Sequence, residues 1–463
     1  MCNDARFDNP NTKRSKSNDK MFLLLCSLTA LDTISWSLAY PTYTSLQREL
    51  NMSLQESQWL TSFLCTITFI STPLIGYICN ITSHKMCLLL SCTGALFGHL
   101  LIYFAKTQEQ YIIGRIIPSF FKCFAPMAQA YTSDITDKSE IVSRLGRLMA
   151  FNNAAWMIGP FLGGLIANHI GTRFPWCIAA IGHGFNLVSM MFVLPTTNKK
   201  IIKYKIDEST TTPTTTTTPT RSSARLKAKE ETKESIQDDN DNDVDENKDD
   251  GNYSLFYFIV MLHIKFMFSF GNCLYETLHG QSLTASPPIG LGESSGFYGW
   301  VLALIGIINT FTNAYLLSLL AKYFSKSNNG WQLLLAIASL GQAGASIMWG
   351  SSTSLIKFVI VSCIIAITNT LFANLVTGKI SESITGKMSG TSLLLLSNVD
   401  RAARITAAPL GGWLVRQGGK DDIGFQWPGI GAGICCGYTG FFLIGWYYWK
   451  RYDMKTSFKV KKD

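Results

Sequence analysis

The sequence predicts an all-α membrane protein with twelve transmembrane helices in two pseudo-symmetric six-helix halves. Of the 463 residues, 47% are hydrophobic and only 15% are charged, which is too apolar for an ordinary soluble globule. Apolar runs of roughly 20 residues, the length that spans a bilayer, recur along the chain. A short glycine motif also occurs twice, with Leu162-Gly163-Gly164 echoed 248 residues later by Leu410-Gly411-Gly412. This echo indicates a duplicated membrane unit.

The first apolar run is preceded by basic residues, as a signal peptide would be. It is too long for one and contains Asp32, so a signal anchor that stays in the membrane is expected. Six runs precede a polar insert and six follow it. The twelve predicted spans are 22–42, 58–79, 86–105, 111–132, 148–168, 175–195, 254–275, 297–320, 332–351, 355–376, 393–415 and 428–449.

Basic residues are distributed unevenly between alternate loops, which predicts the orientation of the chain. With both termini inside, inner segments hold 29 of the 40 Lys and Arg residues, outer loops hold 6, and 5 fall within spans. Basic residues are retained on the cytoplasmic side, so both termini are predicted to be cytoplasmic. The net charge of +9 is therefore mainly a topology signal, and no nucleic-acid partner is predicted.

The polar insert differs from the rest of the chain in composition. It contains a Thr and Pro tract (210–220), a basic patch (221–233) and an acidic block (238–250), and it cannot bury a core. A passive tether and a regulatory segment are both open readings. The predicted parts are a cytoplasmic N-terminal tail (1–20), a first half (21–195), a disordered cytoplasmic loop (196–252), a second half (253–449) and a cytoplasmic C-terminal tail (450–463).

Several local motifs accompany this plan. Arg115 lies in GRIIPSFF, residues 131–134 read YTSD, Gly146-Arg147 follows, and residues 159–164 read GPFLGG. With two six-helix halves and a long central loop, the chain resembles the major facilitator superfamily. It is especially similar, over 113–195, to the tetracycline-antiporter-like branch and an orphan animal member of it. The resemblance implies the major facilitator fold, alternating access and a monomer, and it associates GPFLGG with antiporters.

One motif departs from the family pattern. The loop after the second helix usually carries an Asp-Arg pair that holds the cytoplasmic gate, but here Asn80 replaces the acid. A neutral amide supplies a hydrogen bond about half as strong as a charged one, so the family's gate energetics do not transfer directly. The predicted packing and gating residues are Gly76, Asn80, Lys85, Asp134, Gly159, Pro160, Gly163, Gly164, Pro409, Gly411 and Gly412.

Charged residues inside the spans are functional candidates, because each costs at least a few kcal/mol to insert. Asp32 lies near the middle of the first span. The resemblance places the first and fourth spans together at the central cavity, so Arg115 is the predicted partner of Asp32. A substrate that displaced this pair would let Asp32 take up a proton, which would couple transport to the proton gradient. A permanent ion pair that only orients two helices is the alternative.

A second charged group precedes the repeated glycine motif. Asp400 and Arg404 are one helical turn apart, so Asp400 is expected to neutralise Arg404, and Arg401 points elsewhere. The 248-residue offset places Asn152 and Asn153 at equivalent positions in the fifth span. These residues are predicted to line one asymmetric substrate cavity. Alternatively, the span begins later and the charges cap its cytoplasmic end.

Lys265 falls near the middle of the seventh span. The intramembrane acids Asp32, Glu276 and Asp400 are outnumbered by Arg115, Lys122, Lys265, Arg401 and Arg404, so an anionic solute is favoured. Asn residues of the eighth and tenth spans join the predicted cavity, although hydrogen bonding between helices explains them equally well. Packing is preferred over proton relay for His99, His183 and His263. The cavity residues not yet named are Asn309, Asn313 and Asn369.

These features together predict a secondary active transporter of a small organic solute, proton-coupled and antiporter-like. The sequence has no phosphate-binding loop for ATP, no nucleophile and base of an enzyme, no metal-ligand spacing and no cofactor motif. The predicted partners are the solute, protons and the lipid bilayer, and the membrane could be the plasma membrane, the endoplasmic reticulum or an endolysosomal one. A non-transporting receptor or scaffold that retains the fold is the alternative.

Overall fold

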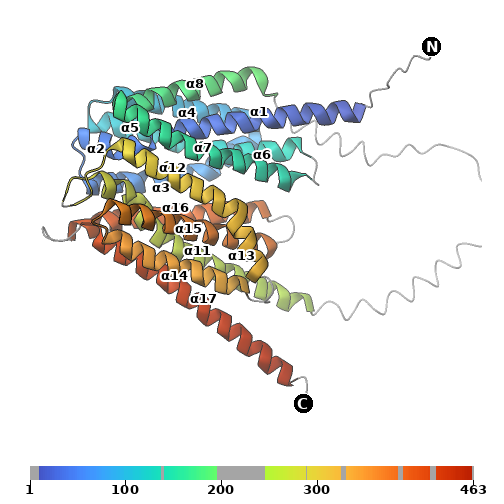
Figure 1. Cartoon of the computed structure of the whole chain (residues 1–463). Coiled ribbons are helices and arrows are strands. Elements are labelled where there is room, and N and C mark those ends of the chain that lie inside the picture. The colour runs from blue at the N-terminus through green and yellow to red at the C-terminus, as the bar shows by residue number, and fades with distance from the viewer. Residues whose placement is uncertain are drawn as a thin grey trace, which may run out of the picture.

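The protein is almost entirely helical in the computed structural model, which describes residues 10–136, 140–195, 246–287, 289–324, 330–383, 389–417 and 424–460. These residues contain helices and turns and no strand. Two helical bundles lie side by side, the first coloured blue to green and the second yellow to red (Figure 1). The predicted fold class is therefore confirmed.

The first bundle contains six spans. The first span is α1 continued by η1 and α2, and the fourth is α5 followed by α6. The elements are α1 (Pro10–Leu38), η1 (Tyr40–Thr42), α2 (Tyr43–Glu49), α3 (Leu54–Ile81), α4 (His84–Phe104), α5 (Gln108–Phe120), α6 (Phe124–Ile135), α7 (Ile141–His169) and α8 (Phe174–Val193).

The second bundle also contains six spans, one of which is α12 continued through the π-helix η2 into α13. Across the described residues, nine segments are long and apolar enough to cross a membrane on length and composition. The elements are α11 (Glu246–Thr284), α12 (Ser295–Phe311), η2 (Thr312–Leu316), α13 (Leu317–Phe324), α14 (Gly330–Gly350), α15 (Leu355–Ser383), α16 (Ser389–Gln417) and α17 (Gln426–Val460).

The fourth span is not the continuous helix that the sequence predicts. It breaks between Phe120 and Phe124, two residues beyond Pro118, which lies inside α5 and cannot donate a backbone hydrogen bond. Pro126 occupies the first turn of α6, where its missing N–H costs nothing. Lys122 lies within this break. A cation in mid-span therefore coincides with irregular backbone, as in other membrane proteins where such backbone lines a functional site.

The ends of the two halves differ partly from the predicted boundaries. Helix α1 already begins within the predicted N-terminal tail, and α17 continues to Val460 within the predicted C-terminal tail. Residues 246–252 of the predicted loop form the first turns of α11, whereas 196–245 lie outside the described residues. Helix α16 begins at Ser389, so Asp400 lies well inside a helix and does not cap its start.

The repeated glycine motifs lie at the two seams between the halves. Helix α7 packs on α12, and α16 packs on α3. A Cβ on Gly164 would lie 2.9 Å from the Gly299 Cα, so α7 and α12 touch backbone to backbone. A Cβ on Gly412 would lie 3.1 Å from the Gln58 Cβ of α3. Because small residues let membrane helices approach closely, the echo marks equivalent positions of the two halves.

The halves are joined mainly at one end of the bundle. We call this the first-loop end, because residues 50–53 connect the first two spans there, and we call the other the termini end (left and right in Figure 1). At the first-loop end the hydroxyls of Ser45 and Ser295 lie 2.5 Å apart, and Arg48 Nη2 donates to Thr284 Oγ1 at 2.5 Å. Farther in, Ser62 donates to the Ile405 carbonyl at 2.6 Å. The conformation is therefore closed at the first-loop end.

Lys85 gives a testable contact at the termini end of the first half. Its Nζ donates to the carbonyls of Met191, in the last turn of α8, and of Leu194, the residue that follows α8, at 3.0 and 2.5 Å. A charged hydrogen bond contributes about 1.5–3 kcal/mol. Lys85→Met is therefore expected to lower the unfolding temperature in detergent by a few degrees. Lys106→Met, at an exposed position, is the control, and equal temperatures for the two variants would contradict the capping role.

Candidate functional site

A partly exposed ion pair lies close to the junction of the halves. Arg404 Nη2 of α16 lies 2.6 Å from Glu276 Oε2 of α11, and the two side chains are 30% and 41% exposed. Both groups also act electrostatically on Tyr40 of η1, which belongs to the other half. An ion pair that is partly accessible to solvent is open to competition from a charged solute.

Three more cations surround this pair. Lys122 is exposed although it lies in mid-span, and it feels the charges of Arg404, Arg115 and Arg401. Arg401 reaches across the halves, where its Nη1 donates to Thr72 Oγ1 at 2.8 Å. Among the described residues, no carboxylate forms an ion pair with Arg115, Lys122 or Arg401. We call these four cations and Glu276 the junction cluster, and its excess of positive charge favours an anion.

Aromatic rings accompany the cations on the side of the first half. The guanidinium of Arg115 lies 4.0 Å above the Tyr43 ring, and its Nη1 donates to the Tyr111 hydroxyl at 3.2 Å. Lys122 Nζ lies 5.1 Å from the Trp36 ring. Such cation–π contacts hold the cations without neutralising their charge, so they stay available to an anion.

A second ion pair crosses between α11 and α16. Lys265 Nζ lies 3.0 Å from Asp400 Oδ1, which also accepts a hydrogen bond from Ser269 at 2.6 Å. The predicted neutralisation of Arg404 by Asp400 is therefore wrong. Helix α11 places Lys265 opposite Asp400 and Glu276 opposite Arg404. Asp400 and Arg404 therefore each pair with a residue of α11 and not with each other along α16.

Asp32 also has a different partner from the one predicted. Its Oδ1 lies 3.3 Å from His183 Nδ1 of α8 and accepts a long contact of 3.8 Å from Cys92 Sγ of α4. The predicted pairing with Arg115 is wrong, because Asp32 points into the first half between α4 and α8, whereas Arg115 faces Tyr43. The coupling role predicted for Asp32 and Arg115 stays a prediction.

The asparagines of the predicted cavity mostly join helices. Asn152 Oδ1 accepts a hydrogen bond from Thr33 of α1. Asn309 Oδ1 accepts from Thr370 at 2.8 Å, and Asn313 Oδ1 accepts from Asn374 at 2.6 Å, so both tie the α12 span to α15. Asn153 is exposed and Asn369 is partly buried. A substrate role for any of them stays a prediction.

The predicted gating residues fall into two groups. Gly159 and Gly163 of α7 face Ser37 and Leu38 of α1 so closely that a Cβ would collide with them, whereas a Cβ on Gly76 would meet nothing within 4 Å. Pro160 lies buried in α7, Pro409 is partly buried in α16, and Gly411 faces Leu278. Asn80 and Asp134 belong to α3 and α6, but their side chains lie outside the described residues.

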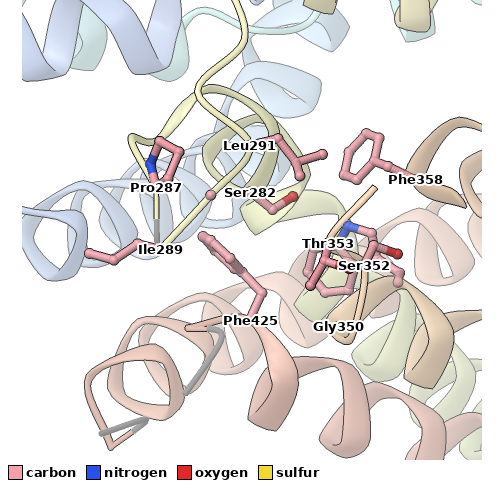
Figure 2. A pocket seen from close by; sticks show the side chains of 11 residues that line it. Ser282, Pro287, Ile289, Leu291, Gly350, Ser352, Thr353, Phe358 and Phe425 are labelled. Carbon is pink, nitrogen blue, oxygen red and sulfur yellow. The ribbon is translucent and has the colours of Figure 1, made fainter. Parts of the chain in front are cut away.

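A pocket of about 340 Å³ opens elsewhere, at the first-loop end of the second half (Figure 2). Rings of Trp349, Phe358 and Phe425 contribute to its wall, and Ser282 and Thr353 supply hydroxyls. No charged side chain lines it, and all its residues come from one half. It lacks the polar groups from both halves that an alternating-access site requires.

Comparison with known proteins identifies the family of this chain. The family model described as the Major Facilitator Superfamily matches residues 25–399. The chain belongs to the Major Facilitator Superfamily. It is similar to the class H tetracycline resistance protein of Pasteurella multocida (28% identical over 185 residues, 39% of this chain and 46% of that protein). The class D protein of Salmonella ordonez is also 28% identical, over 178 residues, 38% of this chain and 45% of that protein. The matches thus span about half the length of these relatives.

Solved structures of the superfamily share the fold across nearly the whole chain. A POT family transporter in complex with 5-aminolevulinic acid has a TM-score of 0.65 at 12% identity, with 92% of this chain and 96% of that one covered. The human organic anion transporter MFSD10 (TETRAN) has a TM-score of 0.59 at 13% identity, with 92% and 99% covered. A D-xylose-proton symporter has a TM-score of 0.63 at 14% identity, with 91% and 96% covered. At such identities the likeness establishes the fold of this superfamily member.

Sequence reasoning identified the charges of the junction cluster but missed the aromatic residues that lie beside it. Tyr40 and Tyr43 lie three residues apart where α1 passes into α2, and both reach the cluster. Their spacing is that of one helix face, which is the signal that could have found them. No local sequence pattern indicated that Asp32, Cys92 and His183 lie together, because three separate helices supply these residues.

Proposed function

We propose that this protein is a secondary active transporter that moves a small organic anion by alternating access, with energy from a proton gradient. The observation that carries the proposal is the junction cluster, which brings together four cations from both halves and one carboxylate, paired with Arg404. A site built from both halves changes its exposure when the halves rock, as alternating access requires. Nearby tyrosine and tryptophan rings favour an anion with an apolar or aromatic body.

Glu276 is the group that we propose for proton coupling. A solute carboxylate that binds Arg404 competes with Glu276 for the same guanidinium. The displaced Glu276 carboxylate, half-exposed between the halves, is then able to take up a proton from water. Binding of the anion and binding of the proton thus favour each other, so the two cross the membrane together. This scheme is a symport, in place of the antiporter-like transport that the sequence predicts. Asp32, the carboxylate favoured by the sequence, is the competing candidate for this role.

We further propose the orientation and setting of the chain. The count of basic residues supports a cytoplasmic position for the termini end, so the closed first-loop end faces the outside or an organelle lumen. The conformation described here would then be open toward the cytoplasm. The transporter acts as a monomer in the plasma membrane, the endoplasmic reticulum or an endolysosomal membrane, because one chain supplies both halves of the site.

Reconstitution tests the proposal directly. The full chain is placed in vesicles that contain a pH-sensitive dye, and citrate, glutarate or p-aminohippurate is added outside, with tetraethylammonium and glucose as the cationic and neutral probes. We expect uptake and a dye response with at least one anion and with neither control probe. Vesicles without protein give the background. Movement of no solute under any gradient would contradict transport and favour the receptor or scaffold alternative.

The coupling residue is tested in the same vesicles. Glu276→Gln keeps the shape of the side chain but cannot take up a proton, so we expect anion uptake that no longer responds to an imposed pH gradient. Asp32→Asn is the matched variant at the competing carboxylate and is expected to retain the response. The opposite pattern, with coupling lost in Asp32→Asn and kept in Glu276→Gln, would overturn the assignment to Glu276.

A further inference from the structure

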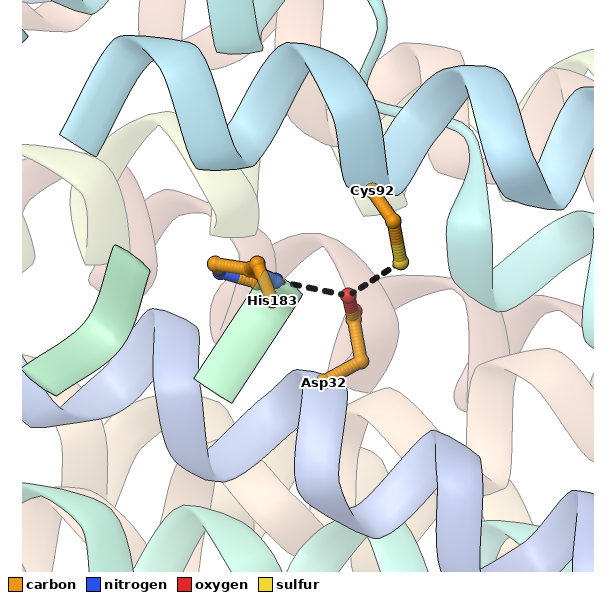
Figure 3. A group of neighbouring side chains, drawn as sticks. All are labelled: Asp32, Cys92 and His183. Carbon is orange, nitrogen blue, oxygen red and sulfur yellow. Dashed lines mark hydrogen bonds and ion pairs between the residues drawn. The ribbon is translucent and has the colours of Figure 1, made fainter. Parts of the chain in front are cut away.

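Asp32, Cys92 and His183 form a compact group of potential metal ligands in the interior of the first half (Figure 3). Each comes from a different helix, namely α1, α4 and α8. Asp32 is 6% exposed, and Cys92 and His183 are both 0% exposed. The group is separate from the junction cluster, because none of its members contacts Arg404 or Glu276.

The spacing of the ligand atoms matches a tetrahedral metal site. Zn²⁺ binds nitrogen and oxygen at about 2.0–2.2 Å and sulfur at about 2.3 Å, so two ligand atoms on one ion lie about 3.3–3.8 Å apart. Asp32 Oδ1 and His183 Nδ1 lie 3.3 Å apart, and Asp32 Oδ1 and Cys92 Sγ lie 3.8 Å apart. All ligand atoms of the group lie within 4.8 Å of one another. The separation of Cys92 Sγ from the His183 ring nitrogen is therefore at most 4.8 Å.

Unsatisfied polar atoms are an independent sign of a missing ligand. Neither ring nitrogen of His183 has a hydrogen-bond partner among the described residues, although the side chain is fully buried. Despite its 3.3 Å approach, His183 Nδ1 is not aligned with Asp32 for a hydrogen bond. A buried polar group without a partner costs about 1–3 kcal/mol. A metal ion between these residues would remove that cost.

The surroundings suit a structural metal ion. The His99 ring stacks on His183 with centroids 5.0 Å apart and an interplanar angle of 2°, and Trp36 meets His183 edge-on at 6.0 Å. These rings fix the orientation of the imidazole, as residues around a metal site commonly do. A dication bound to an aspartate, a thiolate and a neutral imidazole carries no net charge, which suits the apolar interior.

We propose that Asp32, Cys92 and His183 bind a divalent transition-metal ion of the zinc type, which ties α1 to α4 and α8. On binding, the Cys92 thiol releases its proton to water, and the ion forms bonds to Sγ, the Asp32 carboxylate and a His183 nitrogen without any change of oxidation state. A fourth position is left for a water molecule or another group. The role is distinct from transport at the junction cluster.

Cobalt spectroscopy tests the proposal without any transport measurement. Full-length protein in detergent is stripped with a chelator, kept reduced and titrated with Co²⁺. We expect about one ion per chain, a thiolate-to-cobalt charge-transfer band in the near ultraviolet and visible bands of tetrahedral intensity. Cys92→Ser should lose the charge-transfer band, His183→Gln should weaken Co²⁺ binding at least tenfold, and added Zn²⁺ should bleach all the bands.

Matched controls distinguish this site from the other thiols. Cys87→Ser, at a second buried cysteine of α4, and Cys436→Ser, in the other half, should retain the full spectrum. The original protein and Cys92→Ser are first checked to elute as monodisperse protein. Zn²⁺ should then raise the unfolding temperature of the original protein but not that of Cys92→Ser. Absence of a charge-transfer band, or a band that survives in Cys92→Ser, would overturn the proposal and leave Asp32 and His183 as an ion pair.

Discussion

Arg404→Gln is expected to reduce organic-anion transport between about tenfold and a hundredfold. Glutamine keeps most of the length of the arginine side chain, but it lacks the positive charge and the bidentate donor geometry of the guanidinium. A hydrogen bond to a charged group contributes about 1.5–3 kcal/mol, and 1.4 kcal/mol corresponds to a factor of ten. Initial uptake rates at a series of anion concentrations, measured in the reconstituted vesicles, give kcat/KM for the comparison.

Two further variants decide whether the effect is specific to the junction cluster. Arg416→Gln removes an exposed arginine near the end of the same helix and should leave kcat/KM within about twofold of the original protein. In the single variant Arg404→Gln, Glu276 loses its partner and repels the anion. Combining it with Glu276→Gln should therefore restore part of the uptake. Equal losses in the Arg404 and Arg416 variants would refute a special role for Arg404.

Much of the fold could be predicted because membrane spans leave a strong and local signal. The lengths of the apolar runs set the number of spans, and the Gly164 and Gly412 echo gave the correct correspondence between the halves. The break in the fourth span was missed although Pro118 and Pro126 were visible in the sequence. Proline is tolerated inside membrane helices when neighbours satisfy the backbone, so its presence does not by itself decide between a kink and a break.

The partners of the charged residues were harder to predict. Helical spacing shows which residues share a face, and this suggested that Asp400 would neutralise Arg404. Spacing does not show what the neighbouring helix places opposite that face, and α11 places Lys265 and Glu276 there. The same limit applies to Asp32, whose contacts on α4 and α8 depend on the rotation of three helices about their axes. Predicting a charge in the membrane was therefore possible, whereas predicting its partner was not.

Gly164→Ala is expected to destabilise the protein by about 1–3 kcal/mol, in contrast to the same change at Gly412. A Cβ at Gly164 would lie 2.9 Å from the Gly299 Cα and 3.0 Å from the Gly296 carbonyl oxygen. Both atoms belong to the backbone of α12 and cannot rotate away, so the helices must separate. Because these helices join the halves, we also expect at least a tenfold loss of transport. Thermal unfolding in detergent and uptake in vesicles measure the two effects.

The duplicated motif supplies the matched comparison for this prediction. At Gly412 the nearest atoms are Gln55 Oε1 and the Cβ and Cγ of Gln58, each 3.1 Å from the added Cβ. None of them is a backbone atom, and a shift of a few tenths of an ångström relieves the contact. The higher helix propensity of alanine stabilises either variant by up to about 1 kcal/mol relative to glycine. This contribution therefore cancels when Gly164→Ala and Gly412→Ala are compared. Gly344→Ala, where nothing lies within 4 Å of the Cβ, measures the helix-propensity contribution alone. If Gly164→Ala and Gly412→Ala unfold at the same temperature, the backbone contact between α7 and α12 is not what holds that seam.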